Sequence, residues 1–179
     1  MAAWHWDCEM KSPSVVSDEN GIMRKRIVTH HAQQGGESNK CWLNLEQIAT
    51  VEVTSEDPSF PIESVFGSDD GPGWRASEGG EQQIRIIFDQ PVSVRRVQLR
   101  FQETGGERTQ EFALRWSSES GRPATEILRQ QWNFSPGGST TEIEEYVVDL
   151  DGVAVLELAI RPDLRRPEAV ASLASLRLG

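Results

Sequence analysis

The stretch from Phe66 to Phe88 reads FGSDDGPGWRASEGGEQQIRIIF, and it decides the fold class. It contains an acidic loop rich in Gly and Pro, a tryptophan, a second glycine turn and a β-branched strand. Short alternating segments separated by Gly, Pro and Ser turns then continue almost to the C-terminus. Short strands spaced in this way are typical of an antiparallel β-sandwich. A small sandwich of this kind commonly binds a ligand at its loops, so the pattern favours a binding module.

Individual strands follow from alternation of apolar and polar residues. Ile84–Phe88 and Val97–Phe101 both alternate in this way, which predicts strands with one buried face each. Val92 and Val94 lie out of phase with these strands. We therefore expect either a bulge or a late start of the strand near Arg95, where the alternation is restored.

About eight strands are expected, which is the number in a jelly roll of two packed sheets. The final segment, Val170–Leu178, is ambiguous because Val170, Leu173 and Leu176 also keep helical spacing. The expected strands cover residues 48–54, 84–88, 97–101, 112–116, 128–134, 146–150, 156–160 and 170–178. The predicted class is therefore all-β, an antiparallel β-sandwich with jelly-roll topology.

Composition restricts the partners of the chain. Its 179 residues are 37% apolar and 26% charged, which suits one domain with a real core. The net charge of −10 disfavours attraction to phosphate backbones, so no nucleic-acid partner is expected. No segment approaches the roughly 20 apolar residues of a membrane helix. No secretory signal is recognised either, so a cytoplasmic location is the expectation, with export left open if the sequence is truncated.

Residues 1–41 differ from the rest of the chain and are expected to form a partly irregular extension before a sandwich domain at 42–179. Their charges cancel, so the whole net charge falls on residues 42–179. The extension holds every histidine and cysteine of the chain, His5, Cys8, His30, His31 and Cys41. Zinc is bound by four nitrogen or sulfur ligands, but the spacing of these residues matches no standard zinc finger. We therefore predict no metal or other cofactor.

The order of features from Ile48 to the C-terminus resembles the galactose-binding-like superfamily, which includes discoidin domains and many bacterial carbohydrate-binding modules. Four pieces carry the resemblance: ESVFGSDDGPGW at 63–74, QIRIIFDQPVSVRRVQLRF at 83–101, FALRWSSESG at 112–121, and VVDLDGVAVLELAIRPD followed by ASLASLRLG at 147–163 and 171–179. The residues 73–99 also look like the N-terminal domain of the X-ray-repair scaffold protein. The resemblance implies a non-catalytic domain that binds at loops on one end of a sandwich.

The resemblance does not extend to a structural calcium site. Discoidin domains often place an Asp-Gly in the loop before the tryptophan, and that slot falls on Phe66 and Gly67 here. Asp69 and Asp70 follow a few residues later. Calcium needs six to eight oxygen ligands. Whether Asp69 and Asp70 contribute to such a site stays open, and a solvated acidic turn is the simpler interpretation.

The candidate ligand-binding residues are Asp69, Asp70, Arg75, Trp132 and Asn133. Sugars stack their C–H faces on aromatic rings and bond their hydroxyls to Arg, Asn and Asp, which is why these residue types were considered. Trp132 is the predicted stacking platform because the open loop SPGGST follows it closely, although a tryptophan on a strand is more often part of the core. The prediction requires the loops around 55–80 and 135–140 to converge.

No catalytic arrangement is recognised, and no enzyme activity is predicted. Residues 42–179 contain no histidine, so a Ser–His or Cys–His pair has no base there. The leading hypothesis is binding of a carbohydrate or similar polar ligand. The alternatives are a protein-interaction domain, including a homodimer, and more distantly binding to a nucleic acid or a repair complex.

Overall fold

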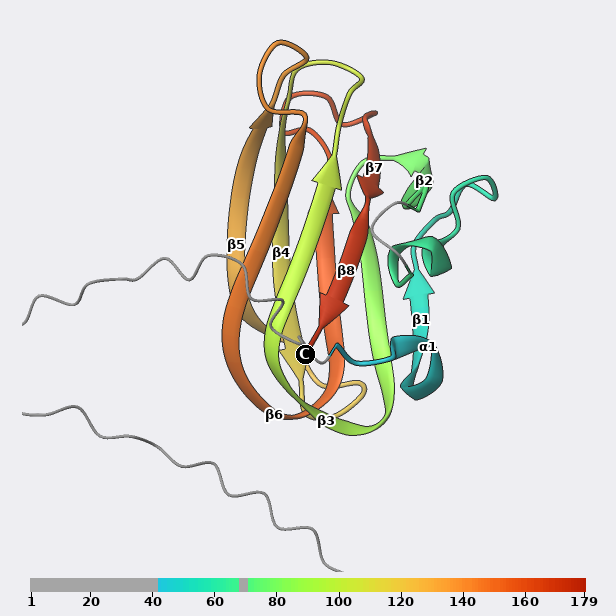
Figure 1. The fold of residues 1–179 in the computed structure, drawn as a ribbon, viewed down its shortest axis with the longest axis vertical. Helices are drawn as coiled ribbons and strands as arrows, with labels where there is room; N and C mark the ends of the chain where they lie inside the picture. Colours follow the sequence, from blue (N-terminus) through green and yellow to red (C-terminus); the bar gives the residue numbers. More distant parts are fainter. Residues whose placement is uncertain (1–41, 68–70) are drawn as a thin grey trace, which may run out of the picture. The chain divides into compact units, whose positions relative to one another are not determined.

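The computed structural model describes residues 42–67 and 71–179, which are almost entirely β structure (Figure 1). The helical elements of this part are two single turns, α1 (Leu45–Ile48) and the 3-10 turn η1 (Ile62–Val65), and neither is long or apolar enough to cross a membrane. The predicted all-β class is confirmed. The strands are β1 (Ala49–Val53), β2 (Trp74–Gly79), β3 (Gln82–Gln102), β4 (Arg108–Ser117), β5 (Thr125–Phe134), β6 (Thr141–Arg161), β7 (Val170–Leu173) and β8 (Ser175–Leu178). The predicted extension, residues 1–41, lies outside the described residues, so its boundary with the sandwich stays a prediction.

Two long strands, β3 and β6, contribute to both layers of the sandwich. Each has 21 residues, and the two pair antiparallel along most of their length. Figure 1 shows both strands turning back on themselves at the end where the C-terminus lies. One layer contains β1, residues 82–88 of β3, residues 155–161 of β6, β4 and β5. The other contains β8, residues 97–102 of β3 and residues 141–147 of β6.

The bends in β3 and β6 have local causes. Pro91 in β3 has no N–H group to donate to a sheet ladder, and Gly152 in β6 has a φ of +68°. The β3–β6 register shifts between Val94 and Arg96 within a continuous strand, so of the two alternatives expected near Arg95 the structure has the bulge and not a late strand start.

The prediction of separate strands on either side of residues 89–96 and 151–155 was wrong, because β3 and β6 each continue through the bend. A proline or an Asp-Gly pair is equally suited to a turn between two strands and to a bend within one strand. Which of the two forms depends on whether a neighbouring strand stays paired through the bend, and the local sequence does not show this.

The two layers enclose one hydrophobic core. Phe101 of β3 and Phe112 of β4 come from opposite layers, and their ring centroids lie 5.2 Å apart. Each buried aliphatic side chain contributes about 1.5–3 kcal/mol to folding, so the alternating residues supply the main stabilisation. The strand residues that are at most 1% exposed include Ile84, Ile86, Val97, Leu99, Leu114, Leu156, Leu158 and Ile160.

The ambiguous C-terminal segment forms two strands, not a helix. β7 pairs with β2, where Leu173 lies opposite Trp74, and β8 pairs with the second half of β3. Ala174 separates the two strands, and burial changes phase just after it, since Leu173 and Ser175 are buried and are followed by buried Leu176 and Leu178. This change of phase explains the apparent helical spacing. Trp74 is only 1% exposed and therefore serves as a packing residue, as its position suggested.

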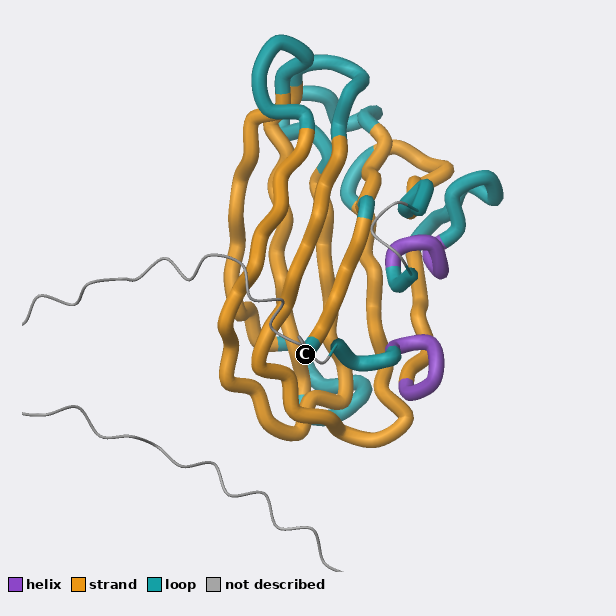
Figure 2. The backbone as a smooth tube through the Cα atoms, in the orientation of Figure 1, coloured by secondary structure: helices purple, strands orange, loops and turns teal. Residues whose placement is uncertain are grey.

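Three loops gather at one end of the sandwich, called the loop end below. They are residues 103–107, 135–140 and 162–169, and Figure 2 shows them in teal at the end opposite the C-terminus. This arrangement follows from the bends, because both ends of β3 and both ends of β6 emerge on the same side. The loop end is therefore where residues far apart in the sequence meet.

Gly73, just before β2, can only be glycine without strain. Its φ is +69°, and a Cβ atom built there would lie 2.6 Å from the carbonyl oxygen of Leu173. We expect Gly73→Ala to lower the free energy of unfolding by about 1–3 kcal/mol from backbone strain, with the clash adding to this loss. Urea unfolding of the variant measures the change. Gly137→Ala is the control, since its Cβ would meet no atom within 4 Å, and equal stability of the two variants would contradict the assignment.

Candidate functional site

Arg75 and Asn133, two of the residues proposed from the sequence, are exposed and point into clefts of the same end of the sandwich. Arg75 lies on β2, with its guanidinium carbon 4.9 Å from the centroid of the Phe60 ring. Asn133 lies on β5, and its Oδ1 accepts a 2.8 Å hydrogen bond from the hydroxyl of Thr109. Arg75 lines one cleft and Asn133 the other, so the convergence of their loops on a single ligand site stays a prediction.

The other three proposed residues are placed differently. Asp69 and Asp70 lie outside the described residues, so their part in a site stays a prediction. Trp132 is half-buried on β5, where it packs against the hydrophobic core. Its indole Nε1 is buried without a hydrogen-bond partner among the described residues. These surroundings fit the core interpretation of Trp132 better than the stacking platform.

Two adjoining clefts form the loop end. The first cleft encloses about 350 Å³ and includes Arg75, while the second encloses about 630 Å³ and includes Asn133. Arg108 and Arg166 line both clefts, so the two form one continuous polar surface. The first cleft is also lined by residues 102–106, Glu168, Ala169, Val170 and Ser172, and the second by Glu107, Thr109, Phe134, Ser135, Asp163 and Arg165.

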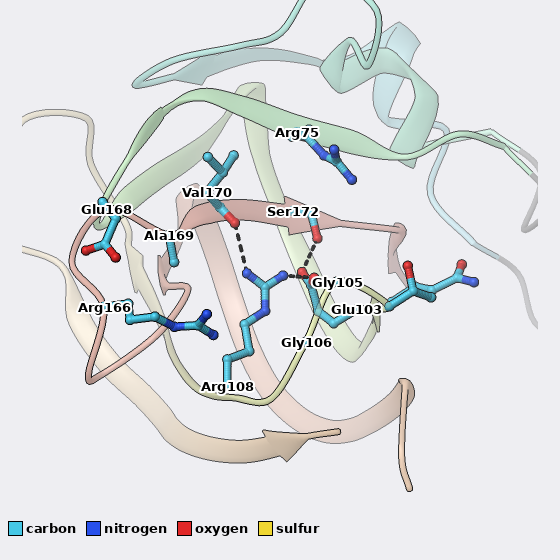
Figure 3. Close-up of a pocket in the computed structure, with 12 residues that line it drawn as sticks. Arg75, Glu103, Gly105, Gly106, Arg108, Arg166, Glu168, Ala169, Val170 and Ser172 are labelled. Carbon is cyan, nitrogen blue, oxygen red and sulfur yellow. Dashed lines mark hydrogen bonds and ion pairs between the residues drawn. The ribbon is translucent and has the colours of Figure 1, made fainter. Parts of the chain in front are cut away.

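A buried ion pair between Glu103 and Arg108 forms the floor of the first cleft (Figure 3). Glu103 is 7% exposed, and its Oε1 also accepts a 2.5 Å hydrogen bond from the Ser172 hydroxyl. Arg108 donates from Nη1 to the carbonyl oxygen of Val170 over 3.0 Å. These bonds tie the 103–107 loop to β7, so the floor of the cleft is held in place by charge-assisted hydrogen bonds.

The electrostatic surroundings of Arg108 are those of a cationic cluster. Burial lowers the pKa of Arg108 to about 10; Asp163 opposes this shift, and the neighbouring Arg166 and Arg75 add to it. Arg108 still carries its charge at neutral pH. The repulsion indicates that three guanidinium groups share one positive region.

Asp163 holds the 162–169 loop in the second cleft. Its Oδ2 accepts a 2.6 Å hydrogen bond from Nε of Arg166, and its Oδ1 accepts one of 3.0 Å from the backbone N–H of Arg165. Burial alone would raise the pKa of Asp163, but backbone hydrogen bonds from Arg165 and Thr109 and the charge of Arg166 lower it overall. Asp163 is therefore an ionised structural group at neutral pH.

Sequence reasoning missed Glu103, Asp163, Arg166 and Ser172. Glu103 precedes Thr-Gly-Gly, and Asp163 lies in the segment Arg-Pro-Asp-Leu-Arg-Arg, so both looked like solvated turn residues. One signal was present: Asp163 and Arg166 are three residues apart with opposite charges, which permits a local pair. Nothing local marks Glu103, whose partners lie on β4 and β7.

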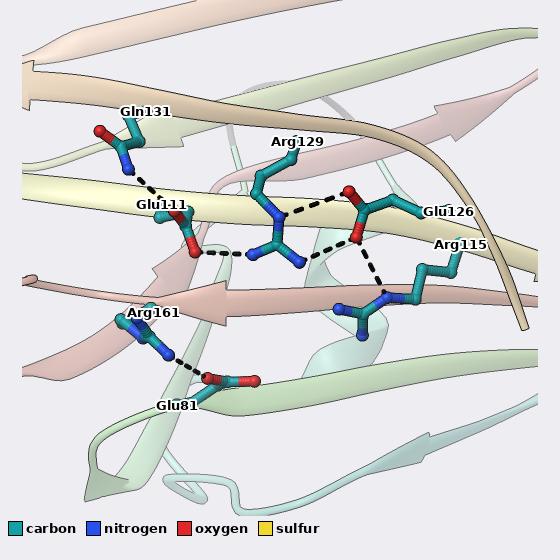
Figure 4. A network of polar contacts seen from close by, with 7 residues as sticks. All are labelled: Glu81, Glu111, Arg115, Glu126, Arg129, Gln131 and Arg161. Atoms are coloured by element: carbon teal, nitrogen blue, oxygen red, sulfur yellow. Dashed lines mark hydrogen bonds and ion pairs between the residues drawn. The ribbon is translucent and has the colours of Figure 1, made fainter.

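A second polar network covers the outer face of β4 and β5 (Figure 4). Arg129 donates to Glu111 over 2.7 Å and to Glu126 over 2.8 Å, and Arg115 lies 3.5 Å from Glu126. Each of these guanidinium groups is matched by a carboxylate on a neighbouring strand. The network therefore supports cross-strand pairing and leaves no unmatched group for a ligand.

No group of three or more His, Cys, Asp or Glu side chains that could hold a metal ion occurs within residues 42–67 and 71–179. The histidines and cysteines considered for zinc all lie outside this part of the chain, as do Asp69 and Asp70.

Solved structures with a similar fold include carbohydrate-binding modules. A family 32 module of NanJ from Clostridium perfringens, in complex with galactose, superposes with a TM-score of 0.57 over 76% of this chain and 96% of that chain, at 14% identity. The family 32 module of AlyQ, in complex with 4,5-unsaturated mannuronic acid, gives a TM-score of 0.54 over 74% and 95%, at 16% identity. A further Clostridium perfringens family 32 module, in complex with GalNAc-β-1,3-galactose, gives 0.56 over 77% and 99%, at 17% identity.

The chain has the galactose-binding-like fold. This likeness confirms the fold expected from the four quoted sequence pieces. No protein-family model matches the sequence, and no curated protein matches it either. At these identities the likeness establishes the fold and does not identify a ligand.

On this galactose-binding-like fold, Glu103 is expected to be essential for stability. Glu103→Gln leaves Arg108 buried without its counter-charge, which should lower the free energy of unfolding by about 3–5 kcal/mol. Urea unfolding measures the loss. The matched control is Glu81→Gln, because Glu81 pairs with Arg161 over 3.2 Å at an exposed site and should contribute less than about 1 kcal/mol. Similar losses in both variants would contradict the role of the buried pair.

The lowered pKa of Asp163 predicts an acid-sensitive contribution to stability. A carboxylate with a depressed folded pKa stabilises the protein above its ordinary pKa of about 4, and this contribution disappears as the pH falls toward the folded value. We expect the stability difference between the wild type and Asp163→Asn to be large at neutral pH and to shrink below about pH 4. Urea unfolding at several pH values tests this. Asp149→Asn is the control, since that side chain is 88% exposed; a pH-independent difference for Asp163→Asn would refute the assignment.

Proposed function

We propose that this chain is a non-catalytic carbohydrate-binding module whose ligand occupies the two clefts of the loop end. The observation that carries the proposal is the position of these clefts: they adjoin each other at the loop end of a galactose-binding-like sandwich. Their walls are fixed by the buried groups Glu103, Arg108 and Asp163, so the surface is formed before a ligand arrives. Preformed sites lose less conformational entropy on binding.

The chemistry of the clefts suits a polyhydroxylated ligand. Arg75, Arg165 and Asn133 supply exposed donors, while the Asn133 amide, the Ser135 hydroxyl and backbone carbonyls supply acceptors. Sugar hydroxyls both donate and accept hydrogen bonds, so they need groups of both kinds. The Phe60 ring lies under Arg75 and is the aromatic surface next to the first cleft.

The absence of catalysis is part of this proposal. The chain has no histidine beyond residue 31 to act as a base. The buried carboxylates of the clefts, Glu103 and Asp163, are both engaged by guanidinium groups. A general acid needs a proton at neutral pH, and the lowered pKa of Asp163 disfavours that state.

Titration calorimetry of the full chain with a panel of neutral and acidic mono- and oligosaccharides tests the proposal. We expect binding of at least one sugar at millimolar concentration or below, and Arg75→Ala and Asn133→Ala should each weaken it by about tenfold, as expected for loss of a good hydrogen bond. Arg122→Ala is the control because Arg122 lies in the turn at the opposite end, paired with Glu119 over 2.8 Å. Absence of binding to every sugar of the panel would overturn the proposed function.

A protein-interaction role is the second candidate, and one observation favours it. Ile143 and Val147 on β6 are 60% and 85% exposed, on the outer face of the layer that contains β8. Apolar side chains this exposed, two on one strand, are compatible with self-association or with a protein partner. Light scattering after size-exclusion chromatography distinguishes the two candidates: a dimer that Val147→Lys dissociates would favour the second, whereas a monomer that binds sugar supports the first.

A further inference from the structure

The loop end carries guanidinium groups that no carboxylate within residues 42–67 and 71–179 neutralises. Every basic residue of positions 42–179 is an arginine, and four of them, Arg75, Arg108, Arg165 and Arg166, line the two clefts. Arginine presents a planar set of donors that matches a carboxylate with two parallel hydrogen bonds. The distribution of these arginines over the two clefts therefore bears on the ligand.

The four arginines differ in how many of their donors are used. Arg108 is engaged by Glu103 and by the carbonyl of Val170. Arg166 donates from Nε to Asp163 over 2.6 Å and from Nη2 to the carbonyl of Glu107 over 2.5 Å, which leaves Nη1 without a partner in the described part of the chain. The side chains of Arg75 and Arg165 have no hydrogen bond or ion pair with any residue of 42–67 or 71–179.

Arg75 is held in place although it has no counter-charge. Its guanidinium stacks on the Phe60 ring at 4.9 Å, which restricts its rotamers before a ligand binds. Figure 3 shows Arg75 on the side of the first cleft opposite Glu168, with the guanidinium of Arg108 between them. The remaining carboxylate of this cleft, Glu103, is already paired. Among the residues that the structure describes, the Arg75 side of the first cleft is therefore positive.

The positive charge at the Arg75 side of the first cleft contrasts with the balanced charges on the outer face of β4 and β5. In the network of Figure 4, Arg129 is matched by both Glu111 and Glu126. The chain as a whole has 28 acidic residues for 18 basic ones, so counter-charges are abundant. Arg75 lies beside a cleft and has no matching carboxylate in the described part of the chain, although carboxylates are in excess, and this favours an anionic group on the ligand.

We propose that the ligand of the loop end is an acidic saccharide, whose sugar carboxylate binds Arg75 in the first cleft while its hydroxyl groups reach Asn133 in the second. Arg166 lines both clefts, and its free Nη1 group donates to the same sugar chain. This inference rests on the proposed carbohydrate-binding function. A single carboxylate fits better than a polyanion, because the net charge of −10 repels a long chain of phosphates or sulfates.

The test compares acidic sugars with their neutral counterparts by titration calorimetry of the full chain. The pairs are galacturonic acid with galactose, mannuronic acid with mannose, and sialyllactose with lactose, so each acidic member carries a single carboxylate. We expect at least one acidic member to bind about ten times more tightly than its neutral counterpart, as expected for a hydrogen bond to a charged group. The pair that shows the preference identifies the acidic sugar.

Arg75→Gln should abolish this preference, so that the acidic member of the pair binds no more tightly than its neutral counterpart. Arg122→Gln is the matched control, because it removes the same charge at the opposite end of the sandwich and should preserve the preference. Arg75 is exposed, so Arg75→Gln should fold, and equal melting temperatures of the variant and wild type verify this. Arg75→Lys should recover only part of the preference, since an ammonium group cannot pair bidentately.

Each outcome has one meaning. Equal binding of acidic and neutral sugars, or a preference that survives Arg75→Gln, overturns the inference but leaves the carbohydrate-binding proposal intact. Absence of binding to all sugars overturns both. Tight, strongly salt-dependent binding of heparin or single-stranded DNA, without a preference for the small acidic sugars, also overturns the inference, because it would indicate a polyanion site.

Discussion

The antiparallel pairing of β3 with β6 is the interaction on which the rest of the structure depends. The two strands stay paired in both layers, from Gln82 opposite Ile160 to Gln102 opposite Thr141. Because both strands bend at the same place, their four ends emerge at one end of the sandwich. The loops 103–107, 135–140 and 162–169 are therefore brought together by the ladder itself. The clefts are a consequence of this bend, which brings together polar residues that lie far apart in the sequence.

Much of the fold could be predicted from the sequence, because alternating burial is a local property. The strand segments Ile84–Phe88 and Val97–Phe101 were recognised from period-two alternation, and a bulge was one of the two alternatives expected near Arg95. The continuity of β3 and of β6 could not be predicted. A proline or glycine shows that the chain changes direction, but only the neighbouring strand shows whether pairing survives the change.

The candidate site could be predicted only where a residue type indicates its role. Arg75 and Asn133 were proposed because donors next to a loop are typical of ligand contacts; both line clefts, and their part in binding stays a prediction. Glu103 was missed because its burial depends on Arg108 and Ser172, which lie on two other strands. Trp132 was proposed as a platform, yet a strand residue at the sheet edge packs inward as readily as outward. Long-range pairing, not local pattern, decides such cases.

The charges of the chain act over two different ranges, and this difference bears on which ligand the clefts select. Buried pairs such as Glu103 with Arg108 act over a single contact and fix the cleft walls, so they contribute geometry and little net field. The surplus of carboxylates acts over longer distances, but salt at physiological strength screens it beyond about 8 Å. A small sugar acid that reaches Arg75 forms the short-range contact with its guanidinium group. The more distant carboxylates of the protein repel it only weakly, because salt screens their charges. A polyanion would extend over the acidic surface and be repelled by carboxylates at many points. The net charge of −10 therefore permits binding of a small sugar acid and disfavours binding of a polyanion.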